Sequence, residues 1–369
     1  MKKNLLLTLF SFFLILLILE FFLGNFWINN ISYFKNKKDF ETYKKYHYKL
    51  HHLKNYKYEK LRDYKYKENL IFSTLNDDFS NKSGKSILIN GDSWAENILE
   101  KNLYRNEINK LFKEVAQKYK SKILNSGATS YSLSPSTLQL KIIRDDFKIN
   151  PERIITIIDQ TDIGDELCRY KNRIKLNVNN QILSINSEKL NLREAYNLEF
   201  AFKKQNLIYS SNFNILKFIK IKKLSNEFEK KYYNYTKKIR CKWENISDPL
   251  LNNLNDNELE YITIVFNRYL DKVFEDKDFK RLYLIFHPHK NHILKKYNFY
   301  YKSLFEKIVN QSNFKSKITI IDFNNIFKKT YKINNNYMSL DQIFVKGDAA
   351  SHLTQKARFL FYKTIFENM

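Results

Sequence analysis

The 369-residue chain contains little glycine, proline, cysteine or methionine, with six, four, two and three residues respectively. The two cysteines, Cys168 and Cys241, lie too far apart to match the ligand spacing of a cysteine-based metal site. They fit either one disulfide in an oxidising compartment or two buried free thiols. Because glycine is so scarce, we expect each glycine to meet a specific demand of the backbone, such as a turn or a close approach.

Acidic residues are also in the minority, since 39 Asp and Glu stand against 64 Lys and Arg, which gives a formal net charge of +25. A charge of this size can indicate a nucleic-acid partner, but such proteins carry a localised basic footprint. Here the lysines are spread along the whole chain, so we expect no nucleic-acid partner. Weak attraction to anionic lipid or acidic polysaccharide is compatible with the charge. Hydrophobic residues make up 43%, which supports a packed core and argues against wholesale disorder.

One long apolar run occurs, at the N-terminus. After Lys2 and Lys3, residues 5–27 are almost wholly apolar and contain Glu20 as their only charge. About 20 such residues span the core of a bilayer. The run has no small-x-small cleavage site and no lipobox cysteine, so we expect residues 1–27 to be an uncleaved signal anchor rather than a cleaved signal peptide. Glu20 is expected to reach the membrane interface as an end residue, and the alternative is a helix–helix contact.

The remainder of the chain predicts an α/β fold. Residues 28–84 lack a clean period and are expected to form a stalk and lead-in. From residue 85, short β-branched runs alternate with stretches of helical spacing, which predicts a mostly parallel sheet covered on both faces. We expect a flavodoxin-like three-layer sandwich at 85–369, with an insertion at about 170–256 that is either a lid or a plain surface elaboration. The five strands are predicted at 86–90, 122–125, 153–158, 282–286 and 318–321, and the main helices at 94–120, 135–147 and 354–366.

Two polar motifs follow the first two predicted strands, at the sheet edge where ligands gather in open parallel sheets. The first is residues 90–94, Asn-Gly-Asp-Ser-Trp, in which Ser93 stands at a strand-to-helix turn. Backbone N–H groups at the start of the following helix can face a developing oxyanion there. The plain alternative is an ordinary helix cap. The second motif, residues 125–128, places Gly127 where the backbone can approach a substrate and present its N–H.

Two further motifs follow later strands. Residues 159–162, Asp-Gln-Thr-Asp, offer a side-chain donor for an oxyanion, although helix-capping acids are the plain alternative. Their carboxylates also raise the question of a metal, but no phosphate-binding or calcium-loop spacing accompanies them, so we expect no metal and no cofactor. The last motif, residues 347–354, contains Asp348 and His352. A histidine near the chain end can act as general base for a serine, with an acid orienting its other nitrogen.

The order of these four motifs resembles that of the SGNH (GDSL-like) hydrolases, over about residues 85–366. This resemblance implies that Ser93 is the nucleophile, His352 the base and Asp348 the acid that orients the base. It also implies an oxyanion hole that includes the backbone N–H groups of Ser93 and Gly127.

The sequence differs from the family pattern in two places. Thr161 stands where the third block of the family carries an asparagine, so Thr161 or Gln160 would supply the side-chain donor to the oxyanion hole. The acid precedes the histidine by four residues here, at Asp348 and His352, where the family spacing is three.

A histidine-rich segment, His287-Pro288-His289-Lys290-Asn291-His292, follows the fourth predicted strand. Three histidines in six residues suggest zinc, but Pro288 breaks helical geometry and no acidic fourth ligand is evident. The alternatives are substrate contact by His287 and His289, packing within the loop, or no special role. By their position at the same edge, Trp94 and Asp162 are further candidates for substrate contact.

The sequence therefore predicts a membrane-anchored serine esterase or acyltransferase that acts through an acyl-Ser93 intermediate. We expect the substrate to be acyl, chiefly acetyl, esters of cell-envelope glycans. The chain would cross the bacterial cytoplasmic membrane once and place its catalytic domain on the periplasmic side. The alternative is a catalytically weak SGNH-like protein that binds or assembles glycans, which the differences at Thr161 and Asp348 favour.

Overall fold

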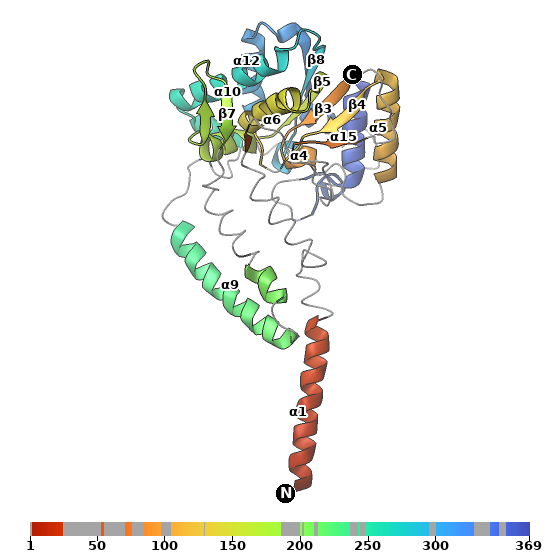
Figure 1. Ribbon diagram of the computed structural model, residues 1–369, viewed down its shortest axis with the longest axis vertical. Helices are drawn as coiled ribbons and strands as arrows, with labels where there is room; N and C mark the ends of the chain where they lie inside the picture. The colour runs from red at the N-terminus through yellow and green to blue at the C-terminus, as the bar shows by residue number, and fades with distance from the viewer. Residues whose placement is uncertain are drawn as a thin grey trace. The chain divides into compact units, whose positions relative to one another are not determined.

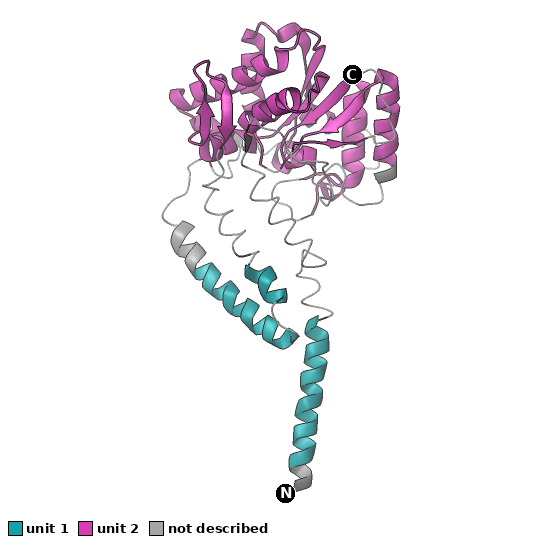
Figure 2. Ribbon diagram, in the orientation of Figure 1, with its two compact units in different colours: residues 1–48, 188–241 teal, residues 49–187, 242–369 magenta. Residues whose placement is uncertain are grey.

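The computed structural model divides into two compact units, which Figure 2 draws in different colours. The helical unit contains residues 1–48 and 188–241, and the sheet unit contains residues 49–187 and 242–369. The structure describes residues 2–24, 53–54, 71–75, 85–96, 105–128, 130–185, 200, 203–209, 213–236, 243, 248–294, 300–327, 340–346 and 352–369.

The sheet unit is built on a six-stranded sheet with the order β2-β4-β3-β5-β8-β9 (Figure 1). All five strands predicted from the sequence are present and pair in parallel. The first parallel strand in the sequence is β3, and the second, β4, pairs with it on one side. The next three strands, β5, β8 and β9, follow in order on the other side of β3. This order places the topological switch point between β3 and β5, where open α/β sheets bind ligands. The parallel strands are β3 (Ser86–Asn90), β4 (Lys122–Asn125), β5 (Pro151–Ile158), β8 (Arg281–Phe286) and β9 (Ile318–Asp322).

The sixth strand, β2 (Ser73–Thr74), comes from the lead-in and pairs antiparallel with β4 at the sheet edge. The sequence does not predict it, since two residues are too few to show a period. The long strands are easier to identify because β3 is buried along its whole length and β8 along all but its first residue. Continuous apolar runs of this kind are typical of parallel strands that are covered on both faces.

Helices cover the sheet on both faces, as predicted. On one face, α5 (Arg105–Tyr119) and α15 (Gln355–Glu367) contact each other and pack on the strands through Phe112 and Phe361. A second group of helices is held together by α10 (Asp256–Phe274), which contacts both α6 (Leu133–Asp145) and α12 (Tyr300–Gln311). The helix predicted at 94–120 is described as α4 (Ser93–Glu96) and α5, and residues 97–104 lie outside the described residues.

The first part of the predicted insertion forms a small antiparallel sheet in the sheet unit. Its order is β1-β7-β6, with β6 (Ile174–Leu176), β7 (Ile182–Ile185) and β1 (Leu53–Lys54), which is contributed by the lead-in. Residues 188–241 belong instead to the helical unit, so the expected insertion at 170–256 is divided between the two units.

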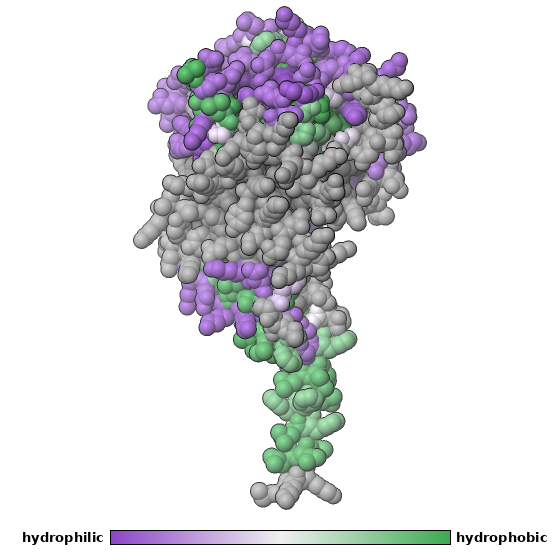
Figure 3. All heavy atoms as spheres, in the orientation of Figure 1, coloured by the Kyte–Doolittle hydropathy of each residue, from purple (hydrophilic) through white to green (hydrophobic). Residues whose placement is uncertain are grey.

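The helical unit contains α1 (Lys2–Phe22), a short helix at 203–209, and α9 (Asn214–Thr236). Within α1, the 18 residues Leu5–Phe22 have a mean hydropathy of 2.7, which makes this helix long and apolar enough to cross a membrane. Its surface is almost uniformly hydrophobic (Figure 3). The carboxylate of Glu20 accepts hydrogen bonds from backbone N–H groups at the start of α9. Of the two alternatives for this residue, the structure therefore agrees with the helix–helix contact.

Cys168 is disulfide-bonded, so for this residue the disulfide is the correct alternative. It lies in the π-helix η3 (Glu166–Tyr170), shortly after β5. The other cysteine of the chain, Cys241, lies outside the described residues.

Candidate active site

Ser93 is the first residue of α4 and stands directly beyond the carboxyl end of β3. The turn between them depends on Gly91, whose φ of 148° is a backbone conformation that residues with a side chain rarely adopt. A Cβ at this position would lie 2.8 Å from the carbonyl oxygen of Ile157. Asp92 then caps the helix, because its Oδ1 accepts a hydrogen bond of 2.9 Å from the N–H of Trp94. The local sequence thus fixes the position of the Ser93 hydroxyl.

The Ser93 hydroxyl lies within hydrogen-bond distance of His352. The Oγ–Nε2 distance is 2.8 Å, although the two residues are 259 positions apart in the chain. The backbone holds His352 in place: its carbonyl accepts a hydrogen bond from the Val345 N–H at 2.8 Å, and Thr354 then caps α15. Both Ser93 and His352 are partly exposed, so a substrate can reach the hydroxyl. A serine that hydrogen-bonds to a histidine is the arrangement of an activated nucleophile and its base.

Asp348, the acid expected to orient His352, lies outside the described residues. Its role therefore stays a prediction.

Of the four donors predicted for the oxyanion hole, Ser93 is the one whose backbone N–H has no acceptor among the described residues. The N–H of Gly127 instead donates to Asn125 Oδ1 at 2.9 Å. The hydroxyl and the N–H of Thr161 donate to Asp159 Oδ1, at 2.6 and 2.7 Å. The side-chain amide of Gln160 lies 3.3 Å from His289 Nδ1. Each of these three groups thus has a hydrogen-bond partner within the protein, and their roles in an oxyanion hole stay predictions.

Gly127 also serves the packing of the loop after β4. A Cβ at this position would lie 2.5 Å from both the Ala95 Cβ and the Glu96 nitrogen. The absence of a side chain therefore lets the loop after β4 press against α4, the helix that carries Ser93. Asn125 stabilises the same contact, since its side-chain amide donates a hydrogen bond of 2.9 Å to the Ala95 carbonyl.

Asp159 is the centre of a buried network that the sequence did not predict. Its Oδ2 accepts the indole N–H of Trp94 at 2.9 Å and lies 2.8 Å from His289 Nε2. Burial by itself would raise the pKa of Asp159, but the hydrogen bonds from His289, Thr161 and Trp94 outweigh burial and hold the pKa below its ordinary value. The sequence does hold a signal for this pair, because Asp159 and His289 follow the ends of two predicted strands, β5 and β8, which are neighbours in the sheet.

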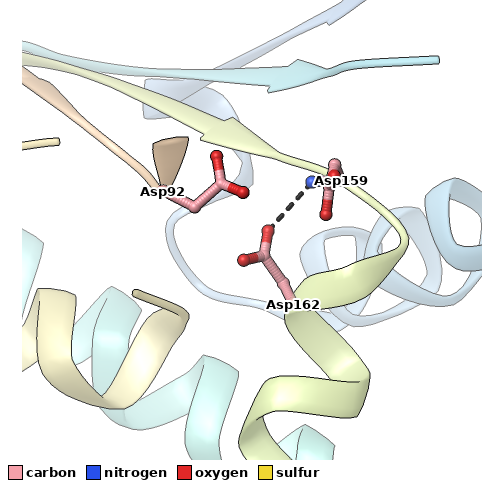
Figure 4. A group of neighbouring side chains, drawn as sticks. All are labelled: Asp92, Asp159 and Asp162. Carbon is pink, nitrogen blue, oxygen red and sulfur yellow. Dashed lines mark hydrogen bonds between the residues drawn. The ribbon is translucent and has the colours of Figure 1, made fainter. Parts of the chain in front are cut away.

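Three buried carboxyl groups lie close together: Asp92, Asp159 and Asp162, shown in Figure 4. One oxygen atom of each group lies within 4.8 Å of one oxygen atom of each of the other two. Burial, together with the nearby Asp159 charge, raises the pKa of Asp92 and of Asp162 well above the ordinary value. One ionised and two protonated carboxyl groups can share such a site. Each also has a structural task, and Asp162 Oδ2 accepts the backbone N–H of Asp159 at 2.9 Å.

The expected substrate contacts lie inside the protein. Trp94, Asp162, His287 and His289 are all buried, which leaves them little surface to offer a ligand. His287 instead stacks on Trp94, with the ring centroids 3.6 Å apart. Burial lowers the pKa of His287 well below its ordinary value, so its ring is neutral. Neither of its ring nitrogens has a partner in the described structure. Packing beneath the Ser93–His352 pair is therefore the role that the geometry gives to these rings.

The three histidines of the 287–292 segment do not converge on one point. His289 pairs with Asp159, and His292 Nδ1 accepts the backbone N–H of His289 at 3.0 Å. Among the described residues, the one group of three ligand atoms close enough to hold a metal ion is the aspartate cluster, and it contains no histidine. Packing within the loop is therefore the alternative that the geometry favours for the segment.

No family model matches the sequence, and the curated proteins contain no match to it. One solved structure that resembles the chain is the crystal structure of LAE5, an alpha/beta hydrolase enzyme from the metagenome of Lake Arreo, Spain. The two proteins share 9% sequence identity, and the match covers 77% of this chain and 94% of that chain with a TM-score of 0.36. Similarity of this degree assigns neither a family nor an activity. The α/β fold of this chain is evident from its own strand order and register.

Proposed function

We propose that this chain is a membrane-anchored serine ester hydrolase or O-acyltransferase of the SGNH type. The observation that carries the proposal is the 2.8 Å distance between Ser93 Oγ and His352 Nε2, formed by two motifs at opposite ends of the domain. The substrate class is acyl esters, chiefly acetyl esters, of cell-envelope glycans. α1 anchors the protein in the membrane, and the sheet unit acts on the extracytoplasmic side.

The reaction proceeds in two steps. His352 Nε2 takes the proton of the Ser93 hydroxyl as Oγ attacks the ester carbonyl. The resulting oxyanion accepts a hydrogen bond from the backbone N–H of Ser93 at the start of α4. The C–O bond of the ester then breaks, and the protonated His352 gives its proton to the leaving alkoxide. The acyl-Ser93 intermediate is resolved by water or by a sugar hydroxyl, whose proton passes to His352 and then to Ser93.

Asp348 is the proposed orienter of His352 in this reaction. Asp159 is a poor candidate for that task, because its carboxylate already pairs with His289 and accepts hydrogen bonds from Trp94 and Thr161. Asp159 instead positions Trp94, the neighbour of the nucleophile.

The extracytoplasmic location is supported by two features. The first is the apolar helix α1 after Lys2 and Lys3, since positive residues favour the cytoplasmic side of a span, although Lys35, Lys37 and Lys38 beyond the helix reduce this bias. The second is the disulfide at Cys168, because disulfides form and persist in oxidising compartments.

The second candidate function is a catalytically weak protein that binds or assembles glycans. The hydrogen bonds of Thr161 to Asp159 favour it, because they remove the third-block donor from the oxyanion hole. Loss of one such donor costs about 10²- to 10³-fold in rate.

The test is Ser93→Ala in the full chain, compared with Ser184→Ala, a partly exposed serine of β7. We expect Ser93→Ala to abolish hydrolysis of p-nitrophenyl acetate, transfer of acetyl to an oligosaccharide, and covalent labelling by a fluorophosphonate. Ser184→Ala should retain all three, and the ratio of the first two activities separates esterase from transferase. An unmodified chain with none of these activities would leave the binding function as the better account.

A further inference from the structure

The end of α1 and the start of α9 are joined by hydrogen bonds within the helical unit. The carboxylate of Glu20 accepts the backbone N–H of Asn214 and, at 2.9 Å, that of Ile215. The Asn214 side-chain amide donates in return to the Glu20 carbonyl at 3.2 Å. A carboxylate on the first N–H groups of a helix satisfies donors that have no intrahelical partner and complements the helix dipole.

The contact is tight as well as polar. A Cβ added to Gly24 would lie 2.4 Å from the side-chain nitrogen of Asn214, so the glycine after α1 leaves room for this side chain. Glu20 stands two residues before the end of the Leu5–Phe22 span. At 1.5 Å per residue, the backbone of Glu20 lies about 3 Å before the end of the apolar span, and the first turn of α9 is hydrogen-bonded to it there.

The two sides of α9 differ in what covers them. On one side, Ile221 is buried and packs against Ile208 of the helix at 203–209. On another side, three large apolar residues are solvent-exposed: Phe213, which directly precedes α9, by 63%, and Leu216 and Ile219 of its first two turns by 47% and 56%. Since residues three and four apart share a helix face, Leu216 and Ile219 lie on one stripe with Lys220 and Lys223, which are also exposed.

We propose that this stripe, which we call the α9 stripe (Phe213, Leu216, Ile219, Lys220 and Lys223), binds the surface of an anionic phospholipid bilayer. The apolar residues enter the boundary between headgroups and acyl chains, and the lysines face lipid phosphates. Its continuity with α1 selects this partner, because the Glu20 contact holds the stripe beside the end of the span. The proposal rests on the proposed anchoring of α1 in a membrane.

The test uses the full chain in vesicles of phosphatidylcholine, with or without phosphatidylglycerol. A fluorophore that responds to polarity is attached at Leu216→Cys or, as the matched control, at Lys222→Cys, an exposed position about 120° away around α9. Quenching by a lipid that carries a nitroxide on its headgroup measures proximity to the bilayer surface. We expect about threefold stronger quenching at Leu216 than at Lys222 in anionic vesicles. In the Leu216→Cys background, replacing Lys220 or Lys223 by Gln should lower the docking equilibrium about fivefold for each lysine.

The outcomes separate the inference from its premise. Extraction of the chain by alkaline carbonate would show that α1 does not anchor it, and the anchoring part of the proposed function would fail. A chain that resists extraction but shows equal quenching at the two positions would overturn the α9 stripe and leave the anchor standing. Equal quenching at Leu216 with and without phosphatidylglycerol would overturn the proposed preference for anionic lipid.

Discussion

At the scale of single residues, His287 and His289 are both buried but differ in the hydrogen-bond partners of their rings. His287 is buried and stacked on Trp94, with no hydrogen-bond partner for either ring nitrogen in the described structure. His289 is buried too, but its Nε2 pairs with the ionised Asp159. Burial of a polar group costs free energy unless a partner compensates, so the two rings should respond differently to replacement.

We expect His287→Phe to leave the free energy of unfolding unchanged or to raise it by about 1 to 3 kcal/mol, because phenylalanine keeps the stacked ring and removes two unpaired nitrogens. His289→Phe should lower it by about 3 to 5 kcal/mol, because Asp159 would become a buried charge without its partner. Urea unfolding in detergent compares the two variants. A larger loss for His287→Phe than for His289→Phe would contradict the assignment.

The raised pKa of Asp162 makes a prediction about pH. Since the folded state favours the protonated carboxyl, its stabilising contribution is full below the unfolded pKa and is lost as pH rises through the folded pKa. Asp162→Asn keeps an oxygen for the Asp159 N–H but does not titrate. We therefore expect this variant to be more stable than the natural protein at pH 7.5 and to lose that advantage at pH 4.5, as measured by urea unfolding.

Asp278→Asn serves as the control for this experiment, because Asp278 is exposed. This control measures the effect of the same Asp-to-Asn change at an exposed position of the sheet unit. A pH-independent effect of Asp162→Asn would mean that the buried carboxyl does not titrate as described.

At the scale of elements, the position of α4 depends on the loop after β4. Gly127→Ala would place a Cβ against Ala95 and Glu96 and push α4 away from the loop. A displacement of 1 Å costs about 10²-fold in rate, so we expect a loss of this order in kcat for ester hydrolysis. The double variant Gly127→Ala with Ala95→Gly should recover part of the rate, because it removes one of the three close contacts, that with the Ala95 Cβ. A single variant with full activity would show that α4 does not need this close approach.

The sequence predicts the elements of the sheet better than it predicts the hydrogen bonds between them. The strands β3, β5 and β8 each contain a short run of largely apolar residues, which is visible without knowledge of the partner strands. β2 is two residues long and is defined only by its pairing with β4. For the same reason, the sequence shows that Thr161 carries a donor but not that Asp159 receives it.

The candidate site shows the same division. Ser93 and His352 were predicted because each belongs to a motif at the end of an element, and the 2.8 Å distance between them agrees with that prediction. The Asp159–His289 pair required a further step, namely that β5 and β8 are neighbours in the sheet. Strand order is a property of the folded chain, and the alternation of strands and helices leaves it open.

At the scale of the whole molecule, the disulfide at Cys168 constrains the unfolded chain. Its reduction should lower the free energy of unfolding by about 2 to 4 kcal/mol. Urea unfolding with and without a phosphine reductant measures the difference, and Cys168→Ser should be insensitive to the reductant. Equal stability of the natural protein in both conditions would mean that the bridge does not restrict the unfolded state.

The bond between Glu20 and the start of α9 also sets an order of events during synthesis. Its two partners are 194 residues apart, so at about 5 to 20 residues per second the ribosome delivers Asn214 about 10 to 40 s after Glu20. The whole of α1 is therefore synthesised while Glu20 still lacks this partner. β8 and β9 are made later still, after residue 241. The residues that make the Glu20 contact are thus all synthesised before the strands β8 and β9 that complete the central sheet.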